Sequence, residues 1–161
     1  MRLNRYLFKS VTSTNDIAIK KIKQDCLRGV IIAKKQTNGR GRYGNKWIYL
    51  RNNLFMSVFF KLDNNISIKK LTSISCKLVR KSLLKLIKKE INIKKPNDLL
   101  IDQKKVCGIL QETIFFKKKK FAVIGIGVNV DKSPTILNYP TTYLNLYSKK
   151  KITISKIYTE I

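Results

Sequence analysis

A hairpin-like pattern in the second half of the chain constrains its fold more than any other feature. Two long apolar runs, Val106–Phe116 and Phe121–Val130, are separated only by the four lysines at 117–120. Runs rich in Ile, Val and Phe predict strands, and so short a polar connection predicts that the two strands pair antiparallel. Leu99–Ile101 precedes them across Asp102-Gln103 and extends the pair to a meander. The lysine run is therefore interpreted as a solvated turn rather than as a binding patch.

The rest of the pattern predicts one α+β domain over residues 1–161. Apolar residues recur every three to four positions from Ile68 to Glu90, which predicts the longest helix. A second helix is expected from Ser13 or Thr14 to about Asp25, and a third after Thr153 or Ser155. Further strands are expected at Leu3–Val11, Val30–Lys35, Leu54–Leu62 and Ile91–Lys94. With no repeat and no linker, the predicted fold is a mixed, largely antiparallel β-sheet with helices packed on one face.

Histidine is absent from the 161 residues, which excludes Ser-His-Asp and Cys-His mechanisms and His-ligated zinc sites. The three cysteines, at positions 26, 76 and 107, are too far apart for a CxxC pair and too few for a Cys₄ site. Any chemistry must come from Lys, Arg, Asp, Glu, hydroxyls, amides and the backbone. The cysteine usage, the lack of a signal peptide and the lack of a run of roughly 18–20 apolar residues predict a cytoplasmic protein with no membrane partner.

The net charge of +26 raises the question of a nucleic-acid partner, because lysine-rich surfaces attract phosphate backbones. Only seven of the 35 basic residues are arginine, whereas base and phosphate readers favour the bidentate guanidinium. Lys, Asn and Ile are all abundant and share A/T-rich codons, which indicates a compositional bias. We expect no specific nucleic-acid partner, and a polyanion-binding role stays open as the alternative.

Six of the seven glycines fall in three short clusters, and the first cluster also concentrates arginine. The segment from Gln36 to Trp47 contains Gly39-Arg40-Gly41-Arg42. Glycines let successive backbone N–H groups form an anion nest, and arginines add guanidinium forks for phosphate or carboxylate. Arg40 and Arg42 have no acidic neighbours in sequence, so residues 37–46 are predicted to be mobile without ligand. A nucleic-acid-binding arm is the open alternative for this loop.

Two further clusters follow. Asp98 and Glu112 lie on adjacent predicted strands beside Lys105, and a carboxylate near a lysine can hold Mg²⁺ while the ammonium meets a phosphate. An ordinary turn and strand is the alternative interpretation. Gly125 and Gly127 alternate within a strand and lack the third glycine of a dinucleotide-binding loop, so we interpret them as clearing space for a flat ligand.

Taken in order, these motifs resemble those of the catalytic domain of biotin–protein ligases. The motifs of that family are S-T-N, GRGRxGxxW, KWPND, KxxGIL-x-E and G-x-G-x-N. Here they correspond to Ser13–Asn15, Gly39–Trp47, Lys94–Asp98, Lys105–Glu112 and Gly125–Asn129. The resemblance covers nearly the whole chain and implies a class II synthetase-like fold.

The resemblance also implies an activity. Family members make biotinyl-5′-AMP from biotin and ATP, and then biotinylate a lysine of the biotin carboxyl carrier domain of acetyl-CoA carboxylase or another biotin-dependent carboxylase. The positions that would bind biotin are Ser13, Thr14, Gln36, Gly39, Arg40, Lys105 and Gly108. The positions that would bind ATP are Arg42, Trp47, Asn97 and Asn129, with Mg²⁺ held by Asp98 beside Asn97. Lys105 and Arg42 would be catalytic, since they would neutralise the biotin carboxylate and the α-phosphate.

The chain departs from the family pattern in three ways. Lys95 stands where the family has Trp. No helix-turn-helix segment precedes Tyr6, and the small C-terminal β-barrel of the family is not expected within these residues, so we expect a catalytic domain alone. A homodimer is possible by resemblance. The alternatives are a lipoate or octanoate ligase, whose substrate loop usually contains a histidine, a basic nucleic-acid-binding domain, and an inactive remnant.

Overall fold

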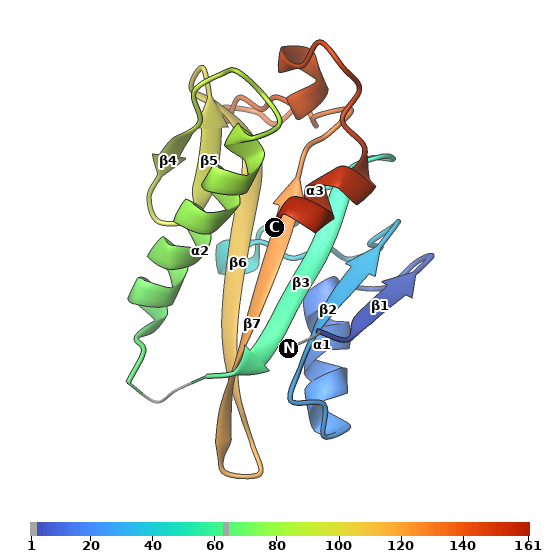
Figure 1. The fold of residues 1–161 in the computed structure, drawn as a ribbon, viewed down its shortest axis with the longest axis vertical. Coiled ribbons are helices and arrows are strands. Elements are labelled where there is room, and N and C mark those ends of the chain that lie inside the picture. Colours follow the sequence, from blue (N-terminus) through green and yellow to red (C-terminus); the bar gives the residue numbers. More distant parts are fainter. Residues whose placement is uncertain (1–2, 63–64) are drawn as a thin grey trace.

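The computed structural model describes residues 3–62 and 65–161, and its centre is a seven-stranded sheet (Figure 1). The strand order is β1-β2-β3-β7-β6-β5-β4. The strands are β1 (Arg5–Phe8), β2 (Arg28–Ala33), β3 (Leu54–Lys61), β4 (Asn92–Lys94), β5 (Asp98–Ile101), β6 (Lys104–Phe116) and β7 (Lys119–Val128). Only β1 and β2 pair in parallel, which confirms the predicted mixed, largely antiparallel sheet.

The β6–β7 hairpin is the longest pairing in the sheet and confirms the predicted meander. Its register runs from Cys107 opposite Val128 to Phe116 opposite Lys119. Lys117 and Lys118 form the connection, with φ of 47° and 59°. Two consecutive residues with positive φ match the right-handed twist of the flanking strands in a two-residue hairpin loop. A tight turn is thus present where it was predicted, but it uses only Lys117 and Lys118, while Lys119 and Lys120 begin β7.

The helices cover both faces of the sheet, so the prediction that they pack on one face is wrong for α1. α2 (Ile68–Leu84) and α3 (Ile154–Glu160) lie on the near face in Figure 1, and α1 (Thr14–Lys23) lies behind the sheet. Leu71 and Ile157 belong to one buried cluster, whereas Ala18 belongs to a second cluster with Phe59 and Val123. Because side chains alternate along a strand, Phe59 and Val123 point away from α2, and an apolar second face needs its own cover.

Two helix boundaries can be compared with their predictions. The end of α2 differs from the predicted one, and the start of α3 decides between two predicted N-caps. α2 ends at Leu84 rather than Glu90. Ile87 lies beyond the helix and is nevertheless buried in the same core, which explains why its spacing extended the apparent helical pattern. Of the two predicted caps for α3, Thr153 is the N-cap, because its hydroxyl accepts a hydrogen bond from the Lys156 amide at 3.3 Å.

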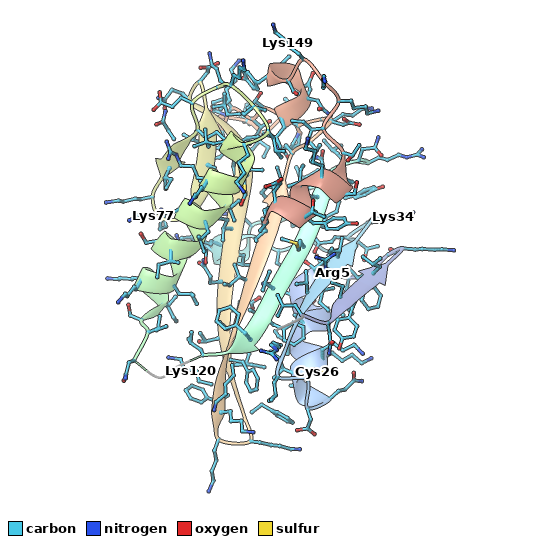
Figure 2. The ribbon with its side chains drawn as sticks, viewed as in Figure 1. Arg5, Cys26, Lys34, Lys77, Lys120 and Lys149 are labelled. Carbon is cyan, nitrogen blue, oxygen red and sulfur yellow. The ribbon has the colours of Figure 1, made fainter. Side chains whose placement is uncertain are left out.

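The basic residues are spread around the molecule rather than gathered on one element. Figure 2 labels Lys34, Lys77, Lys120 and Lys149 in four widely separated parts of the ribbon. Such a distribution gives a diffuse positive field rather than a single groove. Among the described helices, none is both long enough and apolar enough to cross a membrane.

Candidate active site

A cavity of about 640 Å³ opens on the face of the sheet that carries α1. Its wall is formed by the start of α1, the loop from Gln36 to Ile48, strands β5 to β7 and Tyr139. Ten of the twelve predicted site residues line it: Ser13, Thr14, Gln36, Arg40, Arg42, Trp47, Asn97, Asp98, Lys105 and Gly108. The fold therefore brings together motifs from five separate stretches of chain.

One part of the wall, the polar end, consists of Ser13, Thr14, Asn15 and Gln36. All four are less than 9% exposed, and three of them, Gln36, Thr14 and Asn15, are linked by hydrogen bonds that run through Ser57 of β3. Gln36 Oε1 accepts from the Thr14 amide at 2.7 Å and from the Thr14 hydroxyl at 3.0 Å. Ser57 Oγ lies 2.7 Å from Thr14 Oγ1 and 2.6 Å from Asn15 Oδ1. Ser13 is the N-cap of α1 but makes no side-chain capping bond.

Arg40 ties the glycine-rich loop to β6 and α1. Its Nη1 and Nη2 donate to the two carboxylate oxygens of Glu112 at 2.9 and 2.8 Å, and Nη2 also donates to Asp16 at 2.7 Å. Asn15 Nδ2 donates to Glu112 Oε2 at 2.6 Å, so one carboxylate serves both the loop and the helix. Burial alone would lower the pKa of the Arg40 guanidinium, but pairing with Glu112 and then Asp16 raises it. Partners distant in sequence therefore anchor a loop that was predicted to lack them.

The tip of the same loop is held much less firmly. It forms a single 3₁₀ turn, Arg42–Gly44, in which Tyr43 has φ of 54° and Gly44 has φ of 77°. The Tyr43 side chain is 87% exposed. Arg42 donates to the Tyr43 hydroxyl at 2.9 Å and has a long 3.4 Å bond to Asn97 Oδ1. Only neutral groups accept these bonds, so the Arg42 charge stays available to an anion.

The glycines of β6 and β7 accommodate flat groups of the protein itself. Gly108 and Gly127 are cross-strand partners, and a Cβ at either position would collide with the Trp47 indole. A Cβ at Gly125 would lie 2.5 Å from Asn15 Oδ1. The glycines do clear space, but an indole and an amide of the protein occupy it, so the predicted flat ligand on these glycines stays a prediction. Gly39 lies outside the cavity lining, where a Cβ would meet the Trp47 carbonyl oxygen at 2.6 Å.

A second part of the wall, the cationic end, consists of Arg42, Asn97, Asp98, Lys105 and Tyr139. Lys105 Nζ lies 2.9 Å from Asp98 Oδ1, and the two side chains are 19% and 14% exposed. The Lys105 ammonium also lies 5.3 Å from the Trp47 ring centroid. These charges are shielded from bulk water on several sides, which strengthens their effect on a bound anion.

Tyr139 is the site residue that sequence reasoning missed. Its hydroxyl donates to Asp98 Oδ2 at 2.5 Å. Burial and this hydrogen bond raise the pKa of Tyr139, so the phenol stays protonated as a donor at neutral pH. No local pattern marks it, because it follows Asn138 in an irregular segment between Pro134 and Pro140.

Two further positions carry no cavity contact. Asn129 is buried outside the lining, and its Nδ2 donates to the Thr142 carbonyl at 3.1 Å and, weakly, to the Lys105 carbonyl at 3.5 Å. Its predicted contact with adenine stays a prediction. Lys95, at the family's Trp position, is exposed, so a charged side chain there needs no partner in the core.

The two buried cysteines, Cys76 and Cys107, do not supply a nucleophile. Burial raises the pKa of the Cys76 thiol to about 11 and raises that of the fully buried Cys107 still further. The thiolate is the reactive form, and neither thiol ionises near neutral pH.

The donor set around Asp98 fits Mg²⁺ only in company with a nucleotide. Within residues 3–62 and 65–161, no three His, Cys, Asp or Glu side chains gather closely enough to hold a metal ion. A carboxylate offers about four lone-pair sites; Asp98 Oδ2 accepts a hydrogen bond from Tyr139, whereas Oδ1 faces the Lys105 ammonium as an ion pair but accepts no hydrogen bond. Mg²⁺ commonly binds through one or two carboxylates together with substrate phosphates.

The model of the biotin/lipoate A/B protein ligase family matches residues 7–129, a stretch that includes every motif described above. This chain belongs to that family. Membership agrees with the order of the motifs and with their convergence on one cavity.

Individual relatives narrow the likeness to one branch of the family. The bifunctional ligase/repressor BirA of Bacillus subtilis is 34% identical over 110 residues, which cover 65% of this chain and 33% of that protein. A biotin protein ligase of Aquifex aeolicus in complex with biotin and ATP has a TM-score of 0.81 at 26% identity, over 98% of this chain and 66% of that one. A Leishmania major biotin protein ligase with biotinyl-5-AMP has a TM-score of 0.86 at 23% identity, over 99% and 72%. The chain spans about a third to a half of the length of the first curated relatives.

Proposed function

We propose that this chain is a biotin–protein ligase, which activates biotin with ATP and transfers the biotinyl group to a lysine of a carrier domain. The observation that carries the proposal is the polar end of the cavity. Ser13, Thr14, Asn15 and Gln36 place buried hydroxyl and amide groups there, and hydrogen bonds through Ser57 hold the last three in place.

The polar end discriminates between the substrates of the family. The ureido ring of biotin has both hydrogen-bond donors and an acceptor, so it can pair with hydroxyls and amides. The dithiolane of lipoate and the alkyl chain of octanoate cannot pair with them. A site built to hydrogen-bond its substrate rejects an analogue that lacks those groups, because buried polar atoms then lose partners. The chemistry of the wall thus favours biotin.

The cationic end suits the adenylation step. A biotin carboxylate oxygen attacks the α-phosphorus of ATP, and pyrophosphate leaves, giving biotinyl-5′-AMP. Two anions must approach each other, and Lys105 and Arg42 are placed to offset that repulsion. Asp98 and Asn97 would hold Mg²⁺, which would offset charge on the ATP phosphates. The Asn97 side chain is fixed by a 3.0 Å bond from its Nδ2 to the Ile109 carbonyl, which leaves Oδ1 toward Arg42.

Transfer completes the proposed reaction. The amine of a carrier lysine attacks the acyl carbon of biotinyl-5′-AMP, and AMP leaves. The acyl-adenylate is already activated, so a deprotonated lysine amine needs no covalent help from the enzyme. The proposed partner is the biotin carboxyl carrier domain of acetyl-CoA carboxylase or of another biotin-dependent carboxylase. A cytoplasmic location and a homodimer stay predictions.

Pyrophosphate exchange tests the proposal. Labelled pyrophosphate should enter ATP in the presence of biotin, and should not do so with lipoate or octanoate. Gln36→Met keeps the side-chain length but removes the amide, and should weaken biotin-dependent exchange. Gln24→Met, at an exposed position after α1, is the matched control. Exchange driven by lipoate or octanoate but not by biotin would assign the chain to the other branch, and biotin binding without any exchange would identify an inactive remnant.

A further inference from the structure

We propose that Tyr139 is a positioning residue for adenylation, which holds Asp98 and thereby keeps the Lys105 ammonium free to meet the phosphate. This inference rests on the proposed function, because it assigns a role within the same site. It adds a residue that no motif contains and that lies in the segment after β7.

The hydroxyl of Tyr139 divides the Asp98 carboxylate between two partners. Asp98 Oδ2 accepts from Tyr139 at 2.5 Å, and Oδ1 faces Lys105 Nζ at 2.9 Å. A carboxylate held in this way presents one oxygen, not both, to the ammonium. The Lys105–Asp98 pair is therefore weaker than a fully engaged one, and Lys105 can turn toward a bound anion at lower cost.

The ring of Tyr139 forms a wall beside two lysines. Lys94 Nζ lies 4.5 Å from the ring centroid and Lys105 Nζ lies 5.4 Å from it. The Trp47 ring centroid lies 5.3 Å from the same ammonium, so Lys105 contacts two aromatic rings. Aromatic faces attract cations without neutralising them, so the ammonium is located but keeps its charge.

The backbone fixes Tyr139 relative to Lys105. The Lys105 amide donates to the Pro140 carbonyl at 2.8 Å, and the Thr142 amide donates to the Lys105 carbonyl at 2.8 Å. A parallel bridge also pairs Lys105 with Thr141. The segment carrying Tyr139 thus lies alongside the first residues of β6, so the backbone places Tyr139 beside Asp98, and only rotation of the Tyr139 side chain itself can take the phenol away.

Two substitutions separate the hydroxyl from the ring. In Tyr139→Phe, Asp98 Oδ2 is released and both oxygens can engage Lys105, so kcat for biotin-dependent exchange should fall by about tenfold while the KM for biotin changes little. In an Asp98→Asn background the same substitution should cost less than about twofold, because residues that act through one another are not additive. Tyr143→Phe, four residues further along, is the matched control.

A second measurement needs no catalysis. The rate at which an amine-reactive acylating reagent labels Lys105, measured by peptide mass spectrometry on the ligand-free protein, should fall in Tyr139→Phe, which frees Asp98 Oδ2 to engage the ammonium. It should fall less in Tyr139→Leu, where the same release is offset because loss of the ring uncovers the ammonium. Unchanged labelling in both variants would overturn the inference, as would an equal loss of exchange in the wild-type and Asp98→Asn backgrounds. Failure of wild-type exchange with every acid would instead reject the proposed function, while the labelling rates would still decide the role of Tyr139.

Discussion

Side chains at the polar end of the cavity are cross-linked to one another by hydrogen bonds, whereas at the cationic end Arg42 is held only by bonds to neutral groups. Gln36 accepts twice from Thr14, and Glu112, next to the polar end, accepts from both Asn15 and Arg40. At the other end, Arg42 has one long bond to Asn97 and one bond to the exposed Tyr43. The difference matches the chemistry proposed for each end. The polar end would bind the neutral ureido ring of biotin in one geometry. The cationic end would face phosphate groups whose charge changes during the reaction, and such groups need cations that can move.

The largest expected effect is at the cationic end. Lys105→Ala should lower the rate of pyrophosphate exchange by about 10²–10³, because the ammonium meets charge that develops only as the carboxylate attacks phosphorus. Biotin binding, measured by calorimetry, should change far less. Lys104→Ala is the matched control, since Lys104 is the exposed neighbour on the same strand. An equal loss in binding and turnover would show that the two ends do not divide the work as proposed.

The next largest effect concerns the part of the sheet on which the Trp47 indole rests, between the polar and cationic ends of the cavity. In Gly127→Ala, the new methyl would overlap the Trp47 indole, which must lift from the sheet. Overpacking of this kind typically costs about 1–3 kcal/mol. Trp47 is the sole tryptophan, so its emission should shift to longer wavelength as the ring becomes more solvated. Gly44→Ala is the control for steric overlap: its positive φ strains an alanine and should lower stability, but no atom lies near the missing Cβ, so the Trp47 emission should stay unchanged. An unshifted spectrum in Gly127→Ala would mean that the indole does not rest on this pair.

The comparison also separates what the sequence could predict from what it could not. The meander was predictable because apolar alternation and short turns are local signals, and the cavity residues were predictable because glycine and arginine are rare and clustered. The Arg40–Glu112 pair joins residues 72 positions apart, and neither carries a local mark of the other. The position of α1 did leave a signal, namely the apolar Phe59 and Val123 on the second face of the sheet. Tyr139 left none.

A smaller effect is expected at Glu112, whose carboxylate holds Arg40 and the polar-end residue Asn15. Glu112→Gln leaves one acceptor oxygen where the carboxylate offered two, so Arg40 loses half of its fork. Because both side chains are partly exposed, at 35% and 25%, we expect the free energy of unfolding to fall by about 1 kcal/mol. If biotin binding must then restore the native conformation of the loop, the same cost of about 1 kcal/mol is subtracted from the binding free energy. The Kd for biotin then rises by about fivefold.

The control for this substitution is Glu160→Gln. Glu160 pairs with Lys85 at 2.9 Å on the surface, where ion pairs contribute little. Denaturant unfolding and biotin calorimetry on both variants give the comparison. If Glu112→Gln behaves like Glu160→Gln in both measurements, the hydrogen bonds of Glu112 contribute nothing measurable to stability or to biotin binding. The two ends of the cavity would then differ in geometry but not in energy.

The smallest expected effect is a difference in the rate of proteolysis between two sites of the glycine-rich loop, and its measurement requires no substitution. An arginine-specific protease should cleave after Arg42 faster than after Arg40, because Arg40 is bonded to Glu112 and Asp16 while Arg42 precedes the exposed Tyr43. Cleavage requires local opening, and the anchored arginine makes that opening less frequent. Biotin with ATP should slow the cut after Arg42 by recruiting its guanidinium to phosphate, and should change the already slow cut after Arg40 much less. Mass spectrometry of early fragments measures both sites in one digestion, so each arginine is the control for the other. Equal cleavage after the two arginines would support the prediction that the whole loop from 37 to 46 is mobile without ligand. The bonds from Arg40 to Glu112 and Asp16 would then not anchor the loop beside the polar end.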